Sequence, residues 1–128
     1  MQTEVIVVLA REEAGRIDPS LQQLPALQRP PFTTFRSMEV ESRPRVRLVA
    51  GRPSEVALPN GRRLRILLER IMPDGRFQVK VSIDRPRERD YLPLLQVVAS
   101  AGDPFFIAGQ AYAGGTLVVG VRVGESET

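Results

Sequence analysis

The sequence predicts one all-β domain, a mostly antiparallel sandwich or partly closed barrel of about eight or nine short strands with one short helix. Short apolar runs, many of them alternating with polar residues, recur from one end of the chain to the other. Gly, Pro, Asn and Asp separate these runs at intervals of about 8–12 residues, a spacing typical of sandwiches and barrels. The 128 residues are 42% hydrophobic and 26% charged, a balance that lets one domain of this size bury a core.

The N-terminal part combines a strand with the helix. Residues 5–9 form a continuous apolar run rich in β-branched side chains, which predicts a strand covered on both faces. Asp18 followed by Pro19 predicts a helix start, with Asp18 as N-cap and Pro19 in the first turn. This helix would end before the Pro-Pro pair at 30–31 and cover one end of the core with Leu21, Leu24 and Leu27.

From residue 32 onward the pattern is that of strands and turns. The predicted strands cover residues 35–41, 45–50, 55–58, 62–72, 77–83, 92–101, 105–107 and 117–123. The apolar spacing of 62–72 fits a helix as well as a strand, and the turns on both sides favour a strand. Asn60-Gly61 is a strong hairpin signal. We expect charged and glycine-rich loops over residues 84–90 and 109–115, respectively.

No internal repeat or linker divides the chain, so we expect one domain over residues 1–124 and a polar tail over 125–128. The sequence contains no apolar run long enough for a transmembrane helix. The N-terminal apolar run is too short for a signal peptide, and Glu4 stands where a basic flank is usual. The expected location is therefore cytoplasmic, or periplasmic or envelope-associated if a signal peptide was removed.

Composition excludes several kinds of chemistry. The chain has no Cys and no His, so Cys/His metal centres and Ser-His or Cys-His catalytic arrangements are impossible. Lys80 lies at a polar strand position, and the acidic residues of 84–90 alternate with arginines, which favours a solvated loop over an active site. The glycine-rich segment 109–115 lacks the lysine of a P-loop. We therefore expect no enzyme activity, no cofactor and no metal, with a small hydrolase as a distant alternative.

Arginine supplies 17 of the 18 basic residues. An arginine-lined face of a small β domain could bind nucleic acid or another polyanion. Against this, only 5% of residues are aromatic, which leaves few rings for base stacking. The arginines could equally keep a sheet face soluble and block edge pairing. The candidate contacts for a polyanion or a partner are Arg43, Arg45 and Arg47, spaced to share one strand face, and Arg62, Arg63 and Arg65 beside the hairpin.

Two segments, residues 5–9 and 94–98, are apolar on both faces when read as strands. Such strands are either central in a sheet or expose a face that meets a partner. Our leading expectation is therefore a non-enzymatic binding or structural assembly module that acts through a protein partner or self-association. An arginine-dependent nucleic-acid or polyanion binder is the alternative.

Five segments together resemble a group of small, uncharacterised exported β proteins of GC-rich Gram-negative, myxobacteria-like bacteria. They are IDPSL (17–21), PPFTTF (30–35), LPNGRRLRI (58–66), PFFIAGQ (104–110) and GGTL (114–117). The resemblance covers most of the chain and includes no catalytic motif. It implies a periplasmic or envelope protein, and with it a module of the bacterial envelope.

Overall fold

The computed structural model describes residues 2–22, 24–29, 32–59, 61–85, 90–91 and 95–124. These residues contain ten strands, one of them only two residues long. The strands are β1 (Gln2–Arg11), β2 (Ser37–Ser42), β3 (Arg45–Arg47), β4 (Ser54–Ala57), β5 (Arg63–Ile71), β6 (Phe77–Arg85), β7 (Asp90–Tyr91), β8 (Leu95–Ala99), β9 (Phe105–Tyr112) and β10 (Gly115–Val123). The predicted all-β class is confirmed.

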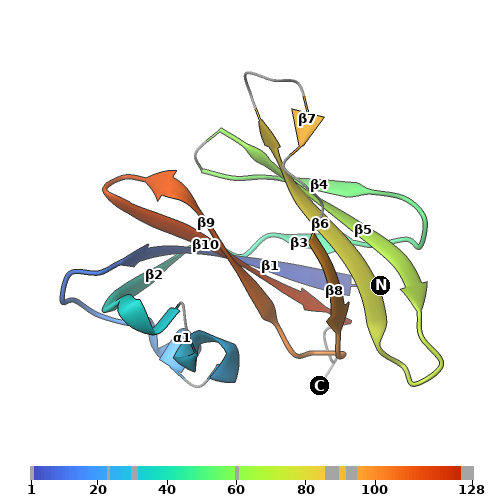
Figure 1. The fold of residues 1–128 in the computed structure, drawn as a ribbon, viewed down its shortest axis with the longest axis horizontal. Coiled ribbons are helices and arrows are strands. Elements are labelled where there is room, and N and C mark those ends of the chain that lie inside the picture. The colour runs from blue at the N-terminus through green and yellow to red at the C-terminus, as the bar shows by residue number, and fades with distance from the viewer. Residues whose placement is uncertain are drawn as a thin grey trace. The chain divides into compact units, whose positions relative to one another are not determined.

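The strands belong to two antiparallel sheets (Figure 1). The first has the order β2-β1-β10-β9, and β3 pairs with the beginning of β1, next to where β2 pairs with its end. The second has the order β4-β5-β6, and both β7 and β8 pair with β6. Within the described residues neither sheet closes on itself, so the chain has two sheets, as a sandwich has, and not one barrel.

Three short helical segments replace the single helix that the sequence predicted. They are α1 (Pro19–Gln22), η1 (Pro25–Gln28) and η2 (Phe32–Thr34), of which the last two are 3-10 turns. Asp18 caps α1 as predicted, because its Oδ1 accepts hydrogen bonds from the backbone N and Oγ of Ser20 at 2.9 and 2.6 Å. Pro25 lacks an N–H and disfavours helical backbone in the residue before it, and Leu24 is accordingly extended.

The chain forms two compact units, and β1 and β10 contribute to both. Unit 1 comprises Met1–Glu4, Pro44–Asp103 and Arg122–Thr128, and unit 2 comprises Val5–Arg43 and Pro104–Val121. In unit 2, alternate residues of β1 pack with the helical segments and their neighbours. This cluster consists of Ile6, Val8, Ala10, Leu21, Leu27, Phe32, Met38 and Val118.

In unit 1, β5 and β6 form a long antiparallel hairpin with one apolar face. Buried residues alternate along both strands, for example Leu64, Ile66 and Leu68 on β5. Residues 62–72 therefore follow the strand alternative, as predicted. The register shifts between Leu68 and Arg70, and such a bulge twists a strand locally.

Tight turns join the strands of each hairpin. The β4–β5 hairpin follows the prediction, and Gly61 adopts a positive φ of 83° that suits glycine. Asn60 lies outside the described residues. In the β5–β6 turn, the backbone N of Met72 donates to the oxygen of Arg76 at 2.7 Å.

Two loop predictions and one strand prediction need correction. Residues 109–115 are not a flexible loop, because β9 runs to Tyr112 and β10 starts at Gly115. Only Ala113 and Gly114 turn the chain, both with positive φ as in a type I′ hairpin. The strand predicted over 45–50 ends at Arg47, and Ala50 is exposed in a turn. Residues 84, 85 and 90 belong to β6 and β7, whereas residues 86–89, 92–94 and 125–128 lie outside the described part.

Candidate functional site

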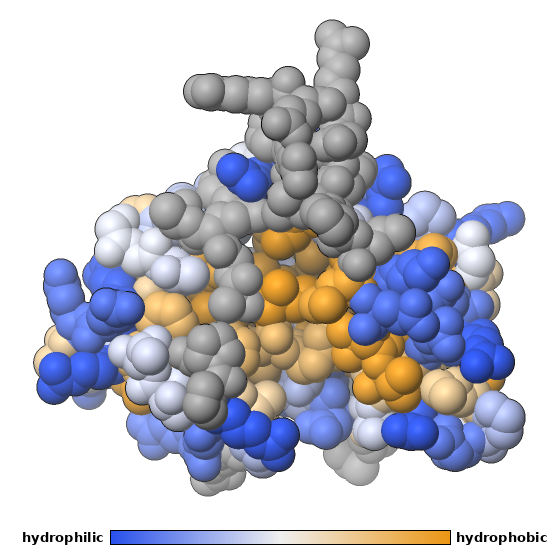
Figure 2. All heavy atoms as spheres, in the orientation of Figure 1, coloured by the Kyte–Doolittle hydropathy of each residue, from blue (hydrophilic) through white to orange (hydrophobic). Residues whose placement is uncertain are grey.

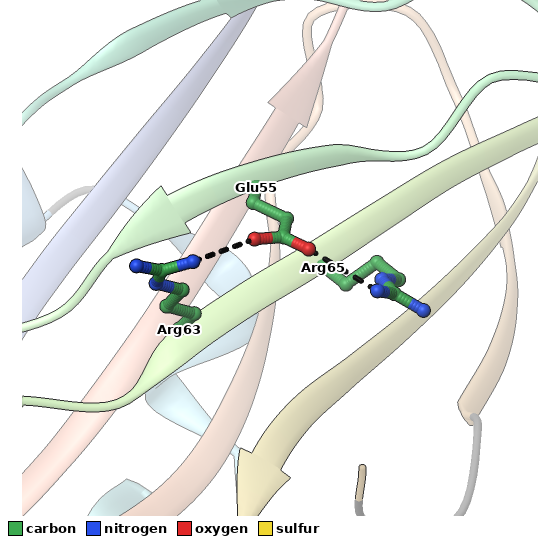
Figure 3. Close-up of polar contacts among 3 residues, drawn as sticks. All are labelled: Glu55, Arg63 and Arg65. Carbon is green, nitrogen blue, oxygen red and sulfur yellow. Dashed lines mark hydrogen bonds and ion pairs between the residues drawn. The ribbon is translucent and has the colours of Figure 1, made fainter. Parts of the chain in front are cut away.

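The arginines at the start of β5 are paired with a carboxylate across the strands. Register places Glu55 of β4 opposite Arg65 of β5. The two carboxylate oxygens of Glu55 accept hydrogen bonds from Arg63 at 3.4 Å and from Arg65 at 3.1 Å (Figure 3). All three side chains are at least one-third exposed, so these ion pairs add little stability. Their effect is to reduce the positive charge available to a polyanion.

The other candidate arginines do not share one strand face. Only Arg45 and Arg47 lie on β3, where both are exposed. Arg43 precedes Pro44, belongs to unit 2 and donates a hydrogen bond to Ser20 Oγ. Arg62 lies just before β5, where its backbone oxygen accepts a hydrogen bond from Leu58 N at 2.8 Å. The structure thus divides the six arginines among β3, the start of β5 and unit 2.

The polar face of β5 and β6 carries a network of hydrogen bonds and one ion pair. Glu69 accepts a hydrogen bond from Gln78 at 3.0 Å and forms an ion pair with Lys80 at 3.2 Å. Gln78 also accepts a hydrogen bond from Arg70 at 3.2 Å. The hydrogen bond from Gln78, with the help of Lys80, holds the pKa of Glu69 below its ordinary value despite some desolvation. Lys80 is thus ion-paired with Glu69 on the neighbouring strand.

One carboxylate lies close to the interior, and it is neutralised. Glu4 of β1 is 5% exposed and pairs with Arg122 of the neighbouring strand β10 at 3.2 Å. A buried carboxylate needs such a partner, because desolvation penalises an isolated charge. The described residues contain no group of three or more Asp or Glu side chains that could hold a metal ion.

Strand β8 exposes apolar side chains at an edge of its sheet. Leu95 is 47% exposed and Val98 is 45% exposed, although β8 pairs with β6 along all five residues. In the described residues β6 is its sole strand partner. Figure 2 shows hydrophilic side chains on the right of the molecule, next to apolar side chains that are uncovered in this view. Solvent-exposed apolar residues on an edge strand mark a surface suited to strand addition.

A shallow apolar groove lies along the helical segments of unit 2. Its volume is about 330 Å³, at the lower end of the range for ligand pockets. The two amides on its wall already bind backbone: Gln22 Nε2 donates to Ile17 O at 3.0 Å and Gln28 Nε2 to Gln22 O at 2.7 Å. The apolar lining consists of Ile17, Leu21, Leu27, Phe32, Phe35 and Met38.

Of these two surfaces, the sequence indicated the apolar segment of β8 but not the groove of unit 2. The apolar run at 94–98 was recognised, together with the choice between a central strand and a partner surface. The structure places residues 95–99 in β8 at a sheet edge, whereas the run at 5–9 is central and buried. The groove was missed because it depends on the turns around Pro25, which the helix prediction did not include.

No family model, curated protein or solved structure matches this chain. Within the described residues, no helix is long and apolar enough to cross a membrane.

Proposed function

We propose that this chain is a non-enzymatic binding or assembly module that takes up a partner polypeptide along the edge strand β8. The observation that carries the proposal is the exposure of Leu95 and Val98 on a strand that pairs on one side within the described residues. An extended segment of a partner can add to such an edge through backbone hydrogen bonds, while alternate side chains contribute specificity.

Val98→Lys tests this function. A lysine on an edge strand opposes strand addition, and the exposed position should tolerate it without unfolding. Ile71→Lys is the matched control, because Ile71 is 56% exposed but lies on β5. The tagged chain and both variants would be purified from the native cells at low and raised salt, with and without nuclease.

Proteins that accompany the wild type and Ile71→Lys but not Val98→Lys would support the proposal. If Val98→Lys keeps the same proteins as the wild type, β8 is not the docking strand and the proposal is wrong. Circular dichroism and melting curves of both variants would confirm that a lost partner does not reflect a lost fold.

The alternative function is a polyanion binder built on Arg45 and Arg47, which are exposed on β3. It has less support, because Glu55 engages Arg63 and Arg65 and because Arg43 binds Ser20. Replacing Arg45 and Arg47 together with Gln should weaken polyanion binding and reduce its dependence on salt. Nucleic acid that copurifies, is lost after nuclease treatment and is absent from the double variant would favour this function over the first.

The resemblance to exported proteins supports a location in the bacterial envelope as part of the proposal. Fractionation of native cells into cytoplasm, periplasm and membranes, followed by detection of the untagged protein, tests this location. Recovery in the cytoplasmic fraction alone would contradict it.

A further inference from the structure

Strand β8 also has the features of a self-complementary edge. Its five residues, Leu95 to Ala99, include no charged side chain and no proline. The opposite edge of the same sheet differs, because β4 contains the charged residue Glu55. Charge and proline are the usual means by which natural edge strands avoid pairing with one another. β8 has neither, so a second copy of the same strand meets no electrostatic repulsion from it.

The order of residues in β8 fits an antiparallel copy of itself. The register that pairs all five residues places Val97 opposite Val97 of the second copy. Leu95 then lies opposite Ala99, which sets a large side chain against a small one, and Gln96 lies opposite Val98. Each contact occurs twice, as twofold symmetry requires.

The apolar face of the sheet would continue through this pairing. Leu95 lies opposite Val81 of β6, and Ala99 lies opposite Phe77. Phe77 and Val81 are buried, whereas Leu95 is 47% exposed. In the symmetric pair, Leu95 of one copy approaches Ala99 and Phe77 of the other, so the exposed leucine extends a row that is already apolar. Burial of this side chain gives the association a hydrophobic driving force.

We propose that two copies of this chain associate through antiparallel pairing of their β8 strands, in a register centred on Val97. This inference rests on the proposed function, since it names the partner polypeptide as a second copy of the chain. It predicts an isologous dimer in which the two β4–β8 sheets become continuous.

Two double variants that differ only at residue 98 test the strand and its register. Both positions are exposed, and Gln96 lies opposite Lys80 within the chain, so a glutamate at 96 should be tolerated. In Gln96→Glu/Val98→Glu, the proposed register sets like charges opposite each other across the interface. In Gln96→Glu/Val98→Lys, it forms two cross-strand ion pairs instead. Sedimentation velocity and light scattering over low to high micromolar concentrations would give the mass of each purified full chain.

The expected result is a wild-type mass that rises with concentration toward twice the monomer value. Gln96→Glu/Val98→Glu should stay monomeric, and Gln96→Glu/Val98→Lys should recover the dimer, with weaker association at raised salt. Melting curves of both variants should show that each remains folded.

Three results would overturn the inference. A wild type that is monomeric throughout excludes the dimer, yet the proposed function survives if Val98→Lys still loses its native partners. A Gln96→Glu/Val98→Glu variant that dimerises like the wild type places the interface elsewhere. Failure of Gln96→Glu/Val98→Lys to dimerise, when the wild type does, excludes the register centred on Val97.

Discussion

Strands β1 and β8 have similar apolar sequences but opposite environments. In β1, residues 3–10 are all buried, and β1 lies between β10 on one side and β2 and β3 on the other. In β8, by contrast, Leu95 and Val98 are close to half exposed, and the described part of the chain provides one neighbouring strand. An apolar sequence thus indicates a strand whose side chains favour burial. The tertiary structure decides whether other parts of the same chain bury them.

The cover of β1 can be traced to particular residues. Its Ile6, Val8 and Ala10 pack in one cluster with residues of the three helical segments, among them Leu21 and Phe32. Phe32 also makes an edge-to-face contact with Phe106, with ring centroids 6.3 Å apart. For β8 we propose that the cover comes from a partner.

The largest effect is expected from truncating one apolar side chain to alanine in each of the two strands. Ile6→Ala should lower the free energy of unfolding by about 2–5 kcal/mol, because it leaves a cavity in a buried cluster. Val98→Ala should change it by no more than about 0.5 kcal/mol at concentrations where the chain is monomeric. Urea unfolding of both variants measures the difference, and similar losses would show that β1 and β8 are equally buried.

A smaller effect should follow from adding a side chain at Gly120, where the Phe106 ring already occupies the space. Gly120 lies on β10, the neighbour of β1, and register places it opposite Phe106 of β9. A Cβ at residue 120 would come within 2.3 Å of Cε2 of the Phe106 ring. Gly120→Val should therefore lower the free energy of unfolding by about 1–3 kcal/mol, because the added side chain overpacks this site.

Adding Phe106→Ala to Gly120→Val separates the clash from other effects of the valine. If the ring is the obstacle, the double variant should be more stable than the sum of the two single effects implies. Strict additivity in urea unfolding would place the cause of the loss elsewhere.

The smallest expected effect is on the stability contributed by Asp18 at the start of α1, and it depends on pH. Hydrogen bonds from the hydroxyl and backbone N of Ser20 lower the pKa of Asp18 from its ordinary value of 3.8. Because the pKa is lower in the folded state, the stabilisation is present above pH 3.8 and is lost as the pH falls through the folded-state value. Asp18→Asn retains a capping side chain but does not titrate.

The stability difference between the wild type and Asp18→Asn should therefore be constant near neutral pH and should shift against the wild type in acid. Urea midpoints over a pH series measure this difference. A difference that is the same at every pH would show that the folded and unfolded chains bind the proton at Asp18 equally.

Local sequence signals determined most of the elements. The alternation of Phe77, Val79, Val81 and Ile83 predicted β6, and turn residues on both sides resolved residues 62–72 as β5, because side-chain period and turn chemistry act over a few residues. The prediction was wrong where local signals were weak. The glycine-rich segment 109–115 suggested a loop, but residues 109–112 lie in β9, where pairing with β10 supplies their strand geometry.

For the candidate sites, the sequence by itself determined which types of side chain are present. Because it has no Cys and no His, it also excluded sites built on these residues. It also marked two apolar segments, but periodicity carries no information about strands distant in the chain. Only the tertiary structure placed β1 at the centre of one sheet and β8 at the edge of another, and only it brought Glu55 between Arg63 and Arg65. Sheet position and cross-strand charge pairing depend on long-range backbone hydrogen bonds, and their register is decided when the whole sheet forms.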